Sequence, residues 1–240
     1  MYFEYGDKEI EYLKSRDAKL AEAIDRIGHI NRPVHTDLFS CVVDDIVGQQ
    51  ISTAAQKTIW KRVVDQLGEV TPSTVSALSV EQIQSWGVSF RKAEYIKDFA
   101  DKVMNGEFII EELVDLPDEE VIERLSSLKG IGRWTAEMLM TFCMQRPDVV
   151  SYGDLAIIRG MRMLYHHRKI DKKLFEKYRR RYSPYGSVAS LYLWAIAGGA
   201  IPEWKDYAPK KKPEKKTSGK GSAKSAKASG KSVKKADKTE

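Results

Sequence analysis

The sequence has few cysteines, no apolar run of membrane-spanning length and little strict alternation of apolar and polar residues. Its longest apolar stretch, from Leu191 to Ile201, is shorter than the roughly 20 residues that a spanning helix needs. The first residues are charged, so we expect neither a membrane contact nor a secretory signal. Cys41 and Cys143 are too few for a zinc or iron–sulfur site and lie in apolar stretches, which predicts buried free thiols and no cofactor.

The patterns that are present are helical. Pro117 and the three acids after it suit the first turn of a helix, because proline fits that turn and acids favour the positive end of the helix dipole. Ser79 and Gln82 fit a capping box, and the apolar residues between Phe90 and Val103 recur with a helical period. We therefore predict an all-α fold of about ten short helices in one or two lobes.

The net positive charge of the chain comes from its C-terminal end. Of 40 basic and 34 acidic residues, the segment from Pro209 holds 12 lysines and three acids, which leaves 28 basic and 31 acidic residues in 1–208. A segment of Lys, Ser, Gly and Ala cannot bury enough apolar surface to fold, so we predict a helical body over 1–208 and a disordered basic tail over 209–240. The tail would hold the protein near nucleic acid, or serve as a solubilising or address segment.

Two glycines one residue apart interrupt two amphipathic runs in LSSLKGIGRWTAEMLM, residues 125–140. This pattern predicts a helix–hairpin–helix over about 120–143. The second helix would begin with unpaired amides, which can donate hydrogen bonds to a DNA phosphate. Gly130 and Gly132 would let the phosphate approach, while a plain turn between helices is the simpler alternative. Further DNA contacts are expected from the residues around the glycines: Lys129, Arg133 and Thr135.

The segment from Leu125 to Arg159 resembles the helix-hairpin-helix superfamily of DNA glycosylases. In that superfamily an essential aspartate follows the hairpin by about twenty residues, and here VVSYGDLAIIRG provides Asp154. The motifs GIGRWTA, VGQQIS and LYLWAIAGG are most similar to the AlkA-like alkylbase glycosylases of the 3-methyladenine type. The resemblance implies two helical lobes with the active-site cleft between them, in a compact version without an N-terminal β domain.

The resemblance also implies roles for individual residues. Asp154 would be the catalytic carboxylate, and Trp134, Trp194 and Met138 would line the base pocket, although Trp194 also suits an ordinary helix core. Bifunctional members carry a lysine where this chain has Trp134, so we expect base release by water without strand cleavage. Gln50, in preference to the alternative Gln49, would fill the space left by the flipped base.

The superfamily also suggests a monovalent cation on hairpin carbonyls, here those of Ser126, Leu128 and Ile131, with no other metal. The predicted function is a monofunctional glycosylase for alkylated purines that acts as a monomer on damaged double-stranded DNA. Its location would be the cytoplasm, with the nucleoid, in a bacterium or the nucleus in a eukaryote. Two alternatives remain: a glycosylase for deaminated or oxidised bases, which would need an acid that the sequence does not reveal, and a DNA-binding module without catalysis.

Overall fold

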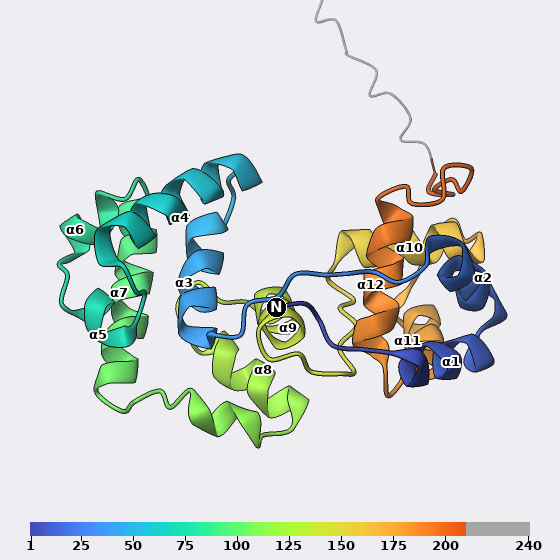
Figure 1. The fold of residues 1–240 in the computed structure, drawn as a ribbon, viewed down its shortest axis with the longest axis horizontal. Coiled ribbons are helices and arrows are strands. Elements are labelled where there is room, and N and C mark those ends of the chain that lie inside the picture. The colour runs from blue at the N-terminus through green and yellow to red at the C-terminus, as the bar shows by residue number, and fades with distance from the viewer. Residues whose placement is uncertain (210–240) are drawn as a thin grey trace, which may run out of the picture. The chain divides into compact units, whose positions relative to one another are not determined.

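The computed structural model describes residues 1–209, which form α-helices and one 3-10 helix, η1 (Figure 1). Strands are absent from this range apart from an isolated bridge between Tyr2 and Pro33, so the all-α prediction is confirmed. The elements are α1 (Asp7–Arg16), α2 (Ala18–Ile27), α3 (Leu38–Gly48), α4 (Thr53–Leu67), α5 (Pro72–Ser76), α6 (Val80–Gln84), α7 (Phe90–Met104), η1 (Glu111–Val114), α8 (Asp118–Ser126), α9 (Arg133–Phe142), α10 (Leu155–Tyr165), α11 (Lys172–Tyr182) and α12 (Gly186–Ala197). No helix in residues 1–209 has the length and apolar character to cross a membrane. The predictions for the lysine-rich tail fall almost entirely outside the described residues.

Local sequence signals set several of these helix boundaries. The predicted capping box is present at α6, where the Ser79 hydroxyl accepts from the Gln82 amide and the Gln82 side chain accepts from the Ser79 amide. Pro117 is the N-cap of α8, and its three acids occupy the first turn as expected. The capping box satisfies amides that helix formation leaves unpaired, and the acids of α8 complement the positive end of the helix dipole. Both signals involve neighbours in sequence, which is why they are predictable.

The buried apolar residues form two clusters, and we name a lobe after each. The hairpin lobe has its core between Leu38 and Val149, from α3 to α9. The terminal lobe has its core in 3–24 and 150–201, so that α1 and α2 pack beside α10, α11 and α12 (Figure 1). The predicted two-lobed organisation is therefore confirmed, and the start of the chain belongs to the same lobe as the helices after residue 150.

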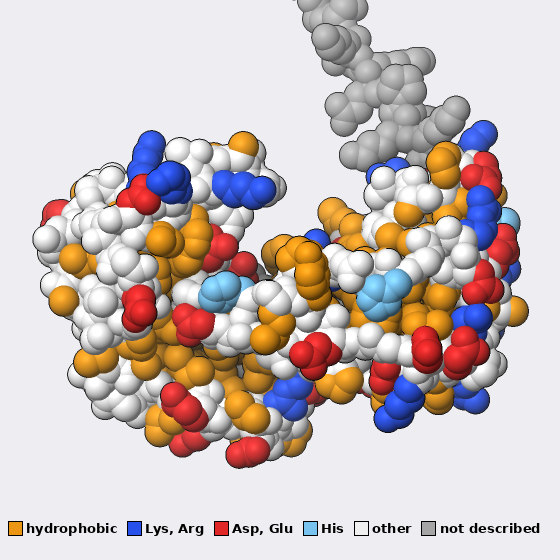
Figure 2. Space-filling view, in the orientation of Figure 1, with side chains coloured by type: hydrophobic (Ala, Val, Ile, Leu, Met, Phe, Trp, Pro, Cys, Tyr) orange, Lys and Arg blue, Asp and Glu red, His pale blue; other side chains and the backbone are white. Residues whose placement is uncertain are grey.

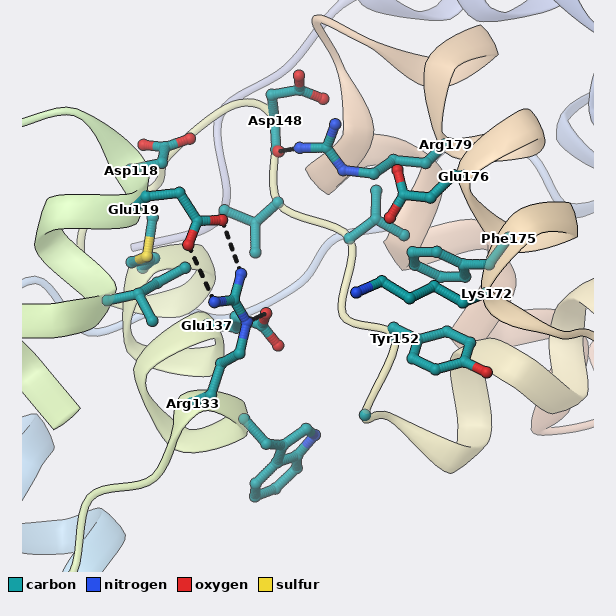
Figure 3. A pocket seen from close by; sticks show the side chains of 16 residues that line it. Asp118, Glu119, Arg133, Glu137, Asp148, Tyr152, Lys172, Phe175, Glu176 and Arg179 are labelled. Atoms are coloured by element: carbon teal, nitrogen blue, oxygen red, sulfur yellow. Dashed lines mark hydrogen bonds and ion pairs between the residues drawn. The ribbon is translucent and has the colours of Figure 1, made fainter.

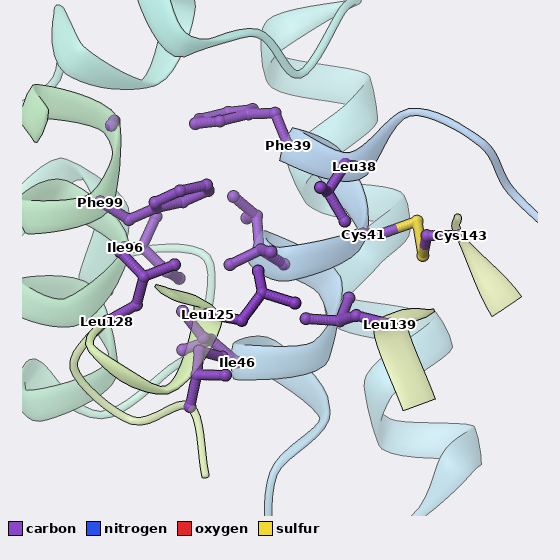
Figure 4. Packing of buried hydrophobic residues seen from close by; sticks show 14 of the residues in the cluster. Leu38, Phe39, Cys41, Ile46, Ile96, Phe99, Leu125, Leu128, Leu139 and Cys143 are labelled. Carbon is purple, nitrogen blue, oxygen red and sulfur yellow. A yellow bond between two sulfur atoms is a disulfide. The ribbon is translucent and has the colours of Figure 1, made fainter. Parts of the chain in front are cut away.

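The two cysteines are joined, contrary to the prediction of free thiols. Cys41 on α3 and Cys143, the C-cap of α9, form a disulfide, and their Cα atoms are 6.7 Å apart (Figure 4). The residues are separated by 102 positions, and only the packing of α3 against α9 brings them together. An apolar environment for each cysteine predicted burial, but it carried no information about this pairing.

A glycine governs how the central helices of the terminal lobe meet. Gly160 on α10 lies against the backbone of α12, where a Cβ atom would overlap the Leu193 carbonyl oxygen. The pair α10 and α12 makes the most extensive contact between helices in the described chain. This close approach fixes the start of α10, where Asp154 lies, relative to Trp194 on α12.

Candidate active site

A cavity of about 580 Å³ opens between the two lobes. Figure 2 shows the described residues hollowed between the side of α3 and α4 and the side of α12. The four residues predicted for catalysis and base binding all line this cavity, although they come from three elements of both lobes. The lining consists of Ile30, Arg32, Asp45, Trp134, Met138, Phe142, Asp154, Leu191, Trp194 and Ala195.

Asp154 is the N-cap of α10 and also faces the cavity. One carboxylate oxygen, Oδ1, accepts from the amides of Ala156 and Ile157 at 2.8 and 2.9 Å. The other, Oδ2, accepts from Trp134 Nε1 at 3.0 Å. These three donors hold the carboxylate in one orientation. Asp154 is only 7% exposed, so little of it is accessible to solvent. Asp154 therefore caps α10, as an isolated aspartate suggests, and the same bonds orient its carboxylate at the cavity.

The cavity has an aromatic lining in addition to its carboxylate. Trp134, at the start of α9, is 49% exposed and leaves a large part of its indole accessible. Trp194 packs on Phe142 with ring centroids 5.2 Å apart, and Arg32 places its guanidinium 4.5 Å from the Phe142 ring. Trp194 thus combines both predicted possibilities, since it packs on the terminal core and lines the cavity. Aromatic surface of this kind can stack on a base and attract a cationic one.

A second carboxyl group, that of Asp45, lies in the same cavity, and sequence reasoning missed it. Asp45 is in the last turns of α3, next to Asp44, and is half-buried. Burial, with a smaller contribution from the neighbouring Asp44, raises the pKa of Asp45 to about 7. Burial also raises the pKa of Asp44, which does not line the cavity. The only signal in the sequence was a pair of acids within the otherwise apolar α3.

The hairpin between α8 and α9 has the predicted form. Gly130 adopts a φ of +84° and lies so close to the Tyr95 ring that a Cβ atom would be 2.6 Å from it. Gly132 is the N-cap of α9, with open space where a side chain would be. The first amides of α9 therefore emerge next to an unobstructed glycine, as an anion site requires. Gly130 serves the turn and the Tyr95 contact, whereas Gly132 clears the approach.

The two basic residues of the hairpin are engaged in ion pairs within the protein. Lys129 pairs with Asp98 on α7 at 2.7 Å. Arg133 holds the Glu119 carboxylate through two hydrogen bonds and reaches Glu137 one turn along α9 at 3.0 Å (Figure 3). These bonds raise the pKa of Arg133 and place its guanidinium in a separate polar hollow of about 730 Å³. Contact of either residue with DNA stays a prediction, as it does for the half-buried Thr135.

The two glutamines after α3 have different surroundings. The Gln49 side chain donates to the Gly130 carbonyl at 2.8 Å, while Lys92 donates to the carbonyls of Gln49 and Val47. Gln49 therefore joins α3 to the hairpin. Gln50 is exposed and has a φ of +58°, a conformation that non-glycine residues rarely adopt and that occurs often at functional loops. This geometry favours Gln50 over Gln49 as the residue that enters the DNA, which stays a prediction.

The predicted cation position on the hairpin is also untested. The Leu128 carbonyl accepts from the Ile131 amide at 3.1 Å, and the buried Ser126 hydroxyl oxygen has no hydrogen-bond partner. Residues 1–209 contain no group of three or more His, Cys, Asp or Glu side chains arranged to hold a metal ion.

Comparison with known proteins identifies the family of this chain. A family model described as "HhH-GPD superfamily base excision DNA repair protein" matches residues 43–184. The chain belongs to this superfamily. It is 33% identical over 175 residues to DNA-3-methyladenine glycosylase 1 of Schizosaccharomyces pombe, covering 71% of this chain and 75% of that protein. The predicted resemblance is therefore confirmed, and the chain is a DNA glycosylase of base excision repair.

Solved structures of related proteins have the same fold. The DNA-3-methyladenine glycosidase of Bacillus halodurans superimposes with a TM-score of 0.77 at 36% identity, over 85% of this chain and 95% of that one. The S. pombe 3-methyladenine DNA glycosylase Mag1, in complex with abasic DNA, superimposes with a TM-score of 0.67 at 31% identity, over 78% and 95% of the two chains. Both similarities extend over the two lobes that form the cavity.

Proposed function

We propose that this HhH-GPD protein is a monofunctional glycosylase that releases alkylated purines, of the 3-methyladenine and 7-methylguanine type, from double-stranded DNA. The observation that carries the proposal is the hydrogen bond from Trp134 Nε1 to Asp154 Oδ2. This bond joins the accessible indole of Trp134 to the oriented carboxylate of Asp154, and both residues line the same cavity. The names of relatives at about 30% identity support the same substrate class.

The cavity suits a nucleotide that has left the DNA stack. A base inside a duplex is out of reach, so the target must be flipped into a pocket. As the bond between C1′ and the base breaks, positive charge develops on the sugar. A carboxylate beside the sugar stabilises that charge and accepts a proton from the attacking water. Asp154 can act in this way, because α10 and Trp134 hold its carboxylate at the cavity.

The aromatic lining accounts for the preference for alkylated purines. A base such as 3-methyladenine carries formal positive charge and leaves easily, and an aromatic face attracts a cation by roughly 0.5–2 kcal/mol. Trp134 and Trp194 provide such faces in the cavity. Met138 also lines the cavity and contributes a polarizable side chain without an electron-rich ring.

Two features favour base release without strand cleavage. A lyase reaction of this kind needs an amine that attacks C1′ and forms a Schiff base. Trp134 occupies the hairpin position of the lysine in bifunctional members, and none of the described residues that line the cavity is a lysine. Water is then the nucleophile, and the product is an abasic site in an intact strand.

The proposal is tested by measuring free base released from methylated duplex DNA by the wild type and by Asp154→Asn. Asparagine is a good N-cap, so the variant should keep α10 and the fold. It cannot accept a proton from water, and we expect release of 3-methyladenine to fall by at least about 100-fold. Intact strands before alkaline treatment, and unchanged DNA affinity of the variant, complete the expected result.

Two outcomes would contradict the proposal in different ways. Strand nicking by the wild type would show that a lysine outside the cavity lining acts as a lyase. Absence of release from any lesion, with DNA affinity intact, would place the chain among binding modules and leave Asp154 as a helix cap.

A further inference from the structure

We propose that Asp45 is a second catalytic carboxyl group, which donates its proton to a ring nitrogen of a neutral flipped purine as the glycosidic bond breaks. This inference rests on the proposed base-releasing function and assigns an acid to the release of purines that must be protonated before they leave. The chemical class is a purine that carries no formal charge, such as the deaminated base hypoxanthine. The sequence offered no acid for such a base, and the cavity contains one.

The position of Asp45 is the first argument. Its side chain lines the same cavity as Asp154, but it comes from α3 in the hairpin lobe, whereas Asp154 caps α10 in the terminal lobe. The two carboxyl groups thus approach the cavity from opposite lobes. A base bound between them could be attacked at the sugar beside one group and protonated by the other, which is the arrangement that leaving-group catalysis requires.

The carboxyl of Asp45 also has no partner among the described residues. Within residues 1–209 it forms no hydrogen bond or ion pair, although Arg32 lines the same cavity and stacks on Phe142 instead. The carboxyl oxygens of Asp45 are not among the fully buried polar atoms that lack a partner, so they are open to the cavity and free to bond a ligand there. Asp154, by contrast, already accepts three hydrogen bonds.

The charged surroundings of Asp45 keep its proton available near neutral pH. Burial is the larger cause and the charge of Asp44 on the same helix the smaller one, and together they raise the pKa of Asp45 to about 7. The cavity contains two further charged groups, Arg32 and Asp154, while α9 and α12 present only neutral side chains to it. Among the neighbouring charged groups, His35 acts electrostatically to lower the pKa of Asp44, against the larger effect of burial. Lys92 of α7 donates to the carbonyls of Val47 and Gln49.

The C1′–N9 bond breaks and its electron pair goes to the purine, while the Asp45 proton moves to a purine ring nitrogen, so the base leaves in neutral form. Water adds to C1′, and its proton passes to the Asp154 carboxylate. Asp45 and Asp154 then exchange protons with solvent. A cationic alkylated purine needs no proton to leave, so its release should not depend on the acidic form of Asp45.

The test compares single-turnover release of hypoxanthine and of 7-methylguanine from duplex DNA by the wild type, Asp45→Asn and Asp45→Glu. Asparagine keeps the size of the side chain but cannot transfer a proton. We expect Asp45→Asn to lose hypoxanthine release by roughly 100-fold or more and 7-methylguanine release by much less, so that the ratio of the two rates falls at least about tenfold. Glutamate should restore part of the hypoxanthine release.

The pH profile separates chemistry from a structural role. The wild-type rate on hypoxanthine should be level just below about pH 7, where Asp154 is still a carboxylate, and fall about tenfold per pH unit above it, because only the acidic form of Asp45 acts. Asp44→Asn is the matched control, since it removes the neighbouring charge without changing the cavity lining. It should keep hypoxanthine release at low pH and shift the inflection to lower pH.

The outcomes that overturn this inference differ from those that overturn the proposed function. If Asp45→Asn slows both bases equally, or the wild type releases only 7-methylguanine, Asp45 is not a leaving-group acid and the alkylpurine proposal stands. If the wild type releases neither base, the proposed function itself fails.

Discussion

Trp134 shows how one residue serves the hairpin, the cavity and the carboxylate together. It is the second residue of α9, directly after the first amide that the hairpin exposes. Its indole lines the cavity, and its Nε1 donates to Asp154 Oδ2. The orientation of the carboxylate is therefore set by a side chain of the hairpin lobe together with two amides of α10.

Replacing Trp134 by phenylalanine separates these contributions. Phenylalanine keeps an aromatic face but removes the donor to Asp154. A hydrogen bond to a charged group contributes about 1.5–3 kcal/mol, so we expect alkylpurine release to fall roughly 10- to 100-fold. Single-turnover kinetics with saturating enzyme measures this fall. Trp204→Phe is the control, since Trp204 packs on the terminal core outside the cavity and should leave the rate unchanged. A wild-type rate for Trp134→Phe would show that the bond does not support catalysis.

The residues of the site divide into those that sequence could predict and those that it could not. Asp154 and Trp134 lie within one stretch whose spacing is distinctive, and Trp194 follows from another short motif. Arg32 has no such pattern around it, and the motifs beside Asp45 and Phe142 assigned neither of them a role. These residues reach the cavity only because α3, the segment before it and the end of α9 pack together, so their roles became visible with the tertiary structure.

At the scale of elements, the contact between α10 and α12 positions the two sides of the terminal lobe that face the cavity. Asp154 precedes α10 and Trp194 lies on α12. Gly160 allows the helices to approach until its Cα faces the backbone at Leu193. Helix caps and the hairpin turn were predictable because each involves neighbours in sequence. This approach was not, because it depends on which two helices meet and at which residues.

Gly160→Ala should therefore destabilise the terminal lobe. The added Cβ would overlap the Leu193 carbonyl oxygen, which belongs to the backbone and cannot rotate away. Overpacking of this kind costs about 1–3 kcal/mol, equivalent to a Tm lower by roughly 2–12 °C for a chain of this size. Differential scanning calorimetry measures the change. The control Gly6→Ala lies in extended backbone with nothing near its Cβ and should shift Tm little. Equal Tm values for the two variants would show that α12 moves without cost.

At the scale of the whole molecule, the site exists only where the two lobes meet. The hairpin lobe supplies Asp45, Trp134 and Met138, and the terminal lobe supplies Asp154 and Trp194. Within the hairpin lobe, α3 and α9 carry the cavity residues of that side, and the Cys41–Cys143 disulfide joins these two helices. The crosslink thus ties together the elements on which Asp45 and Trp134 are placed.

Reduction of this disulfide should lower the stability of the folded protein. A crosslink between residues 102 positions apart restricts the unfolded chain, and such bonds contribute about 2–4 kcal/mol. We expect the Tm to fall by roughly 5–15 °C in the presence of a reductant, with two thiols appearing on titration of the unfolded protein. The double variant Cys41→Ser/Cys143→Ser should have a low Tm that does not respond to the reductant. If the wild type releases two thiols and keeps its Tm, the packing of α3 on α9 alone holds the hairpin side of the cavity in place.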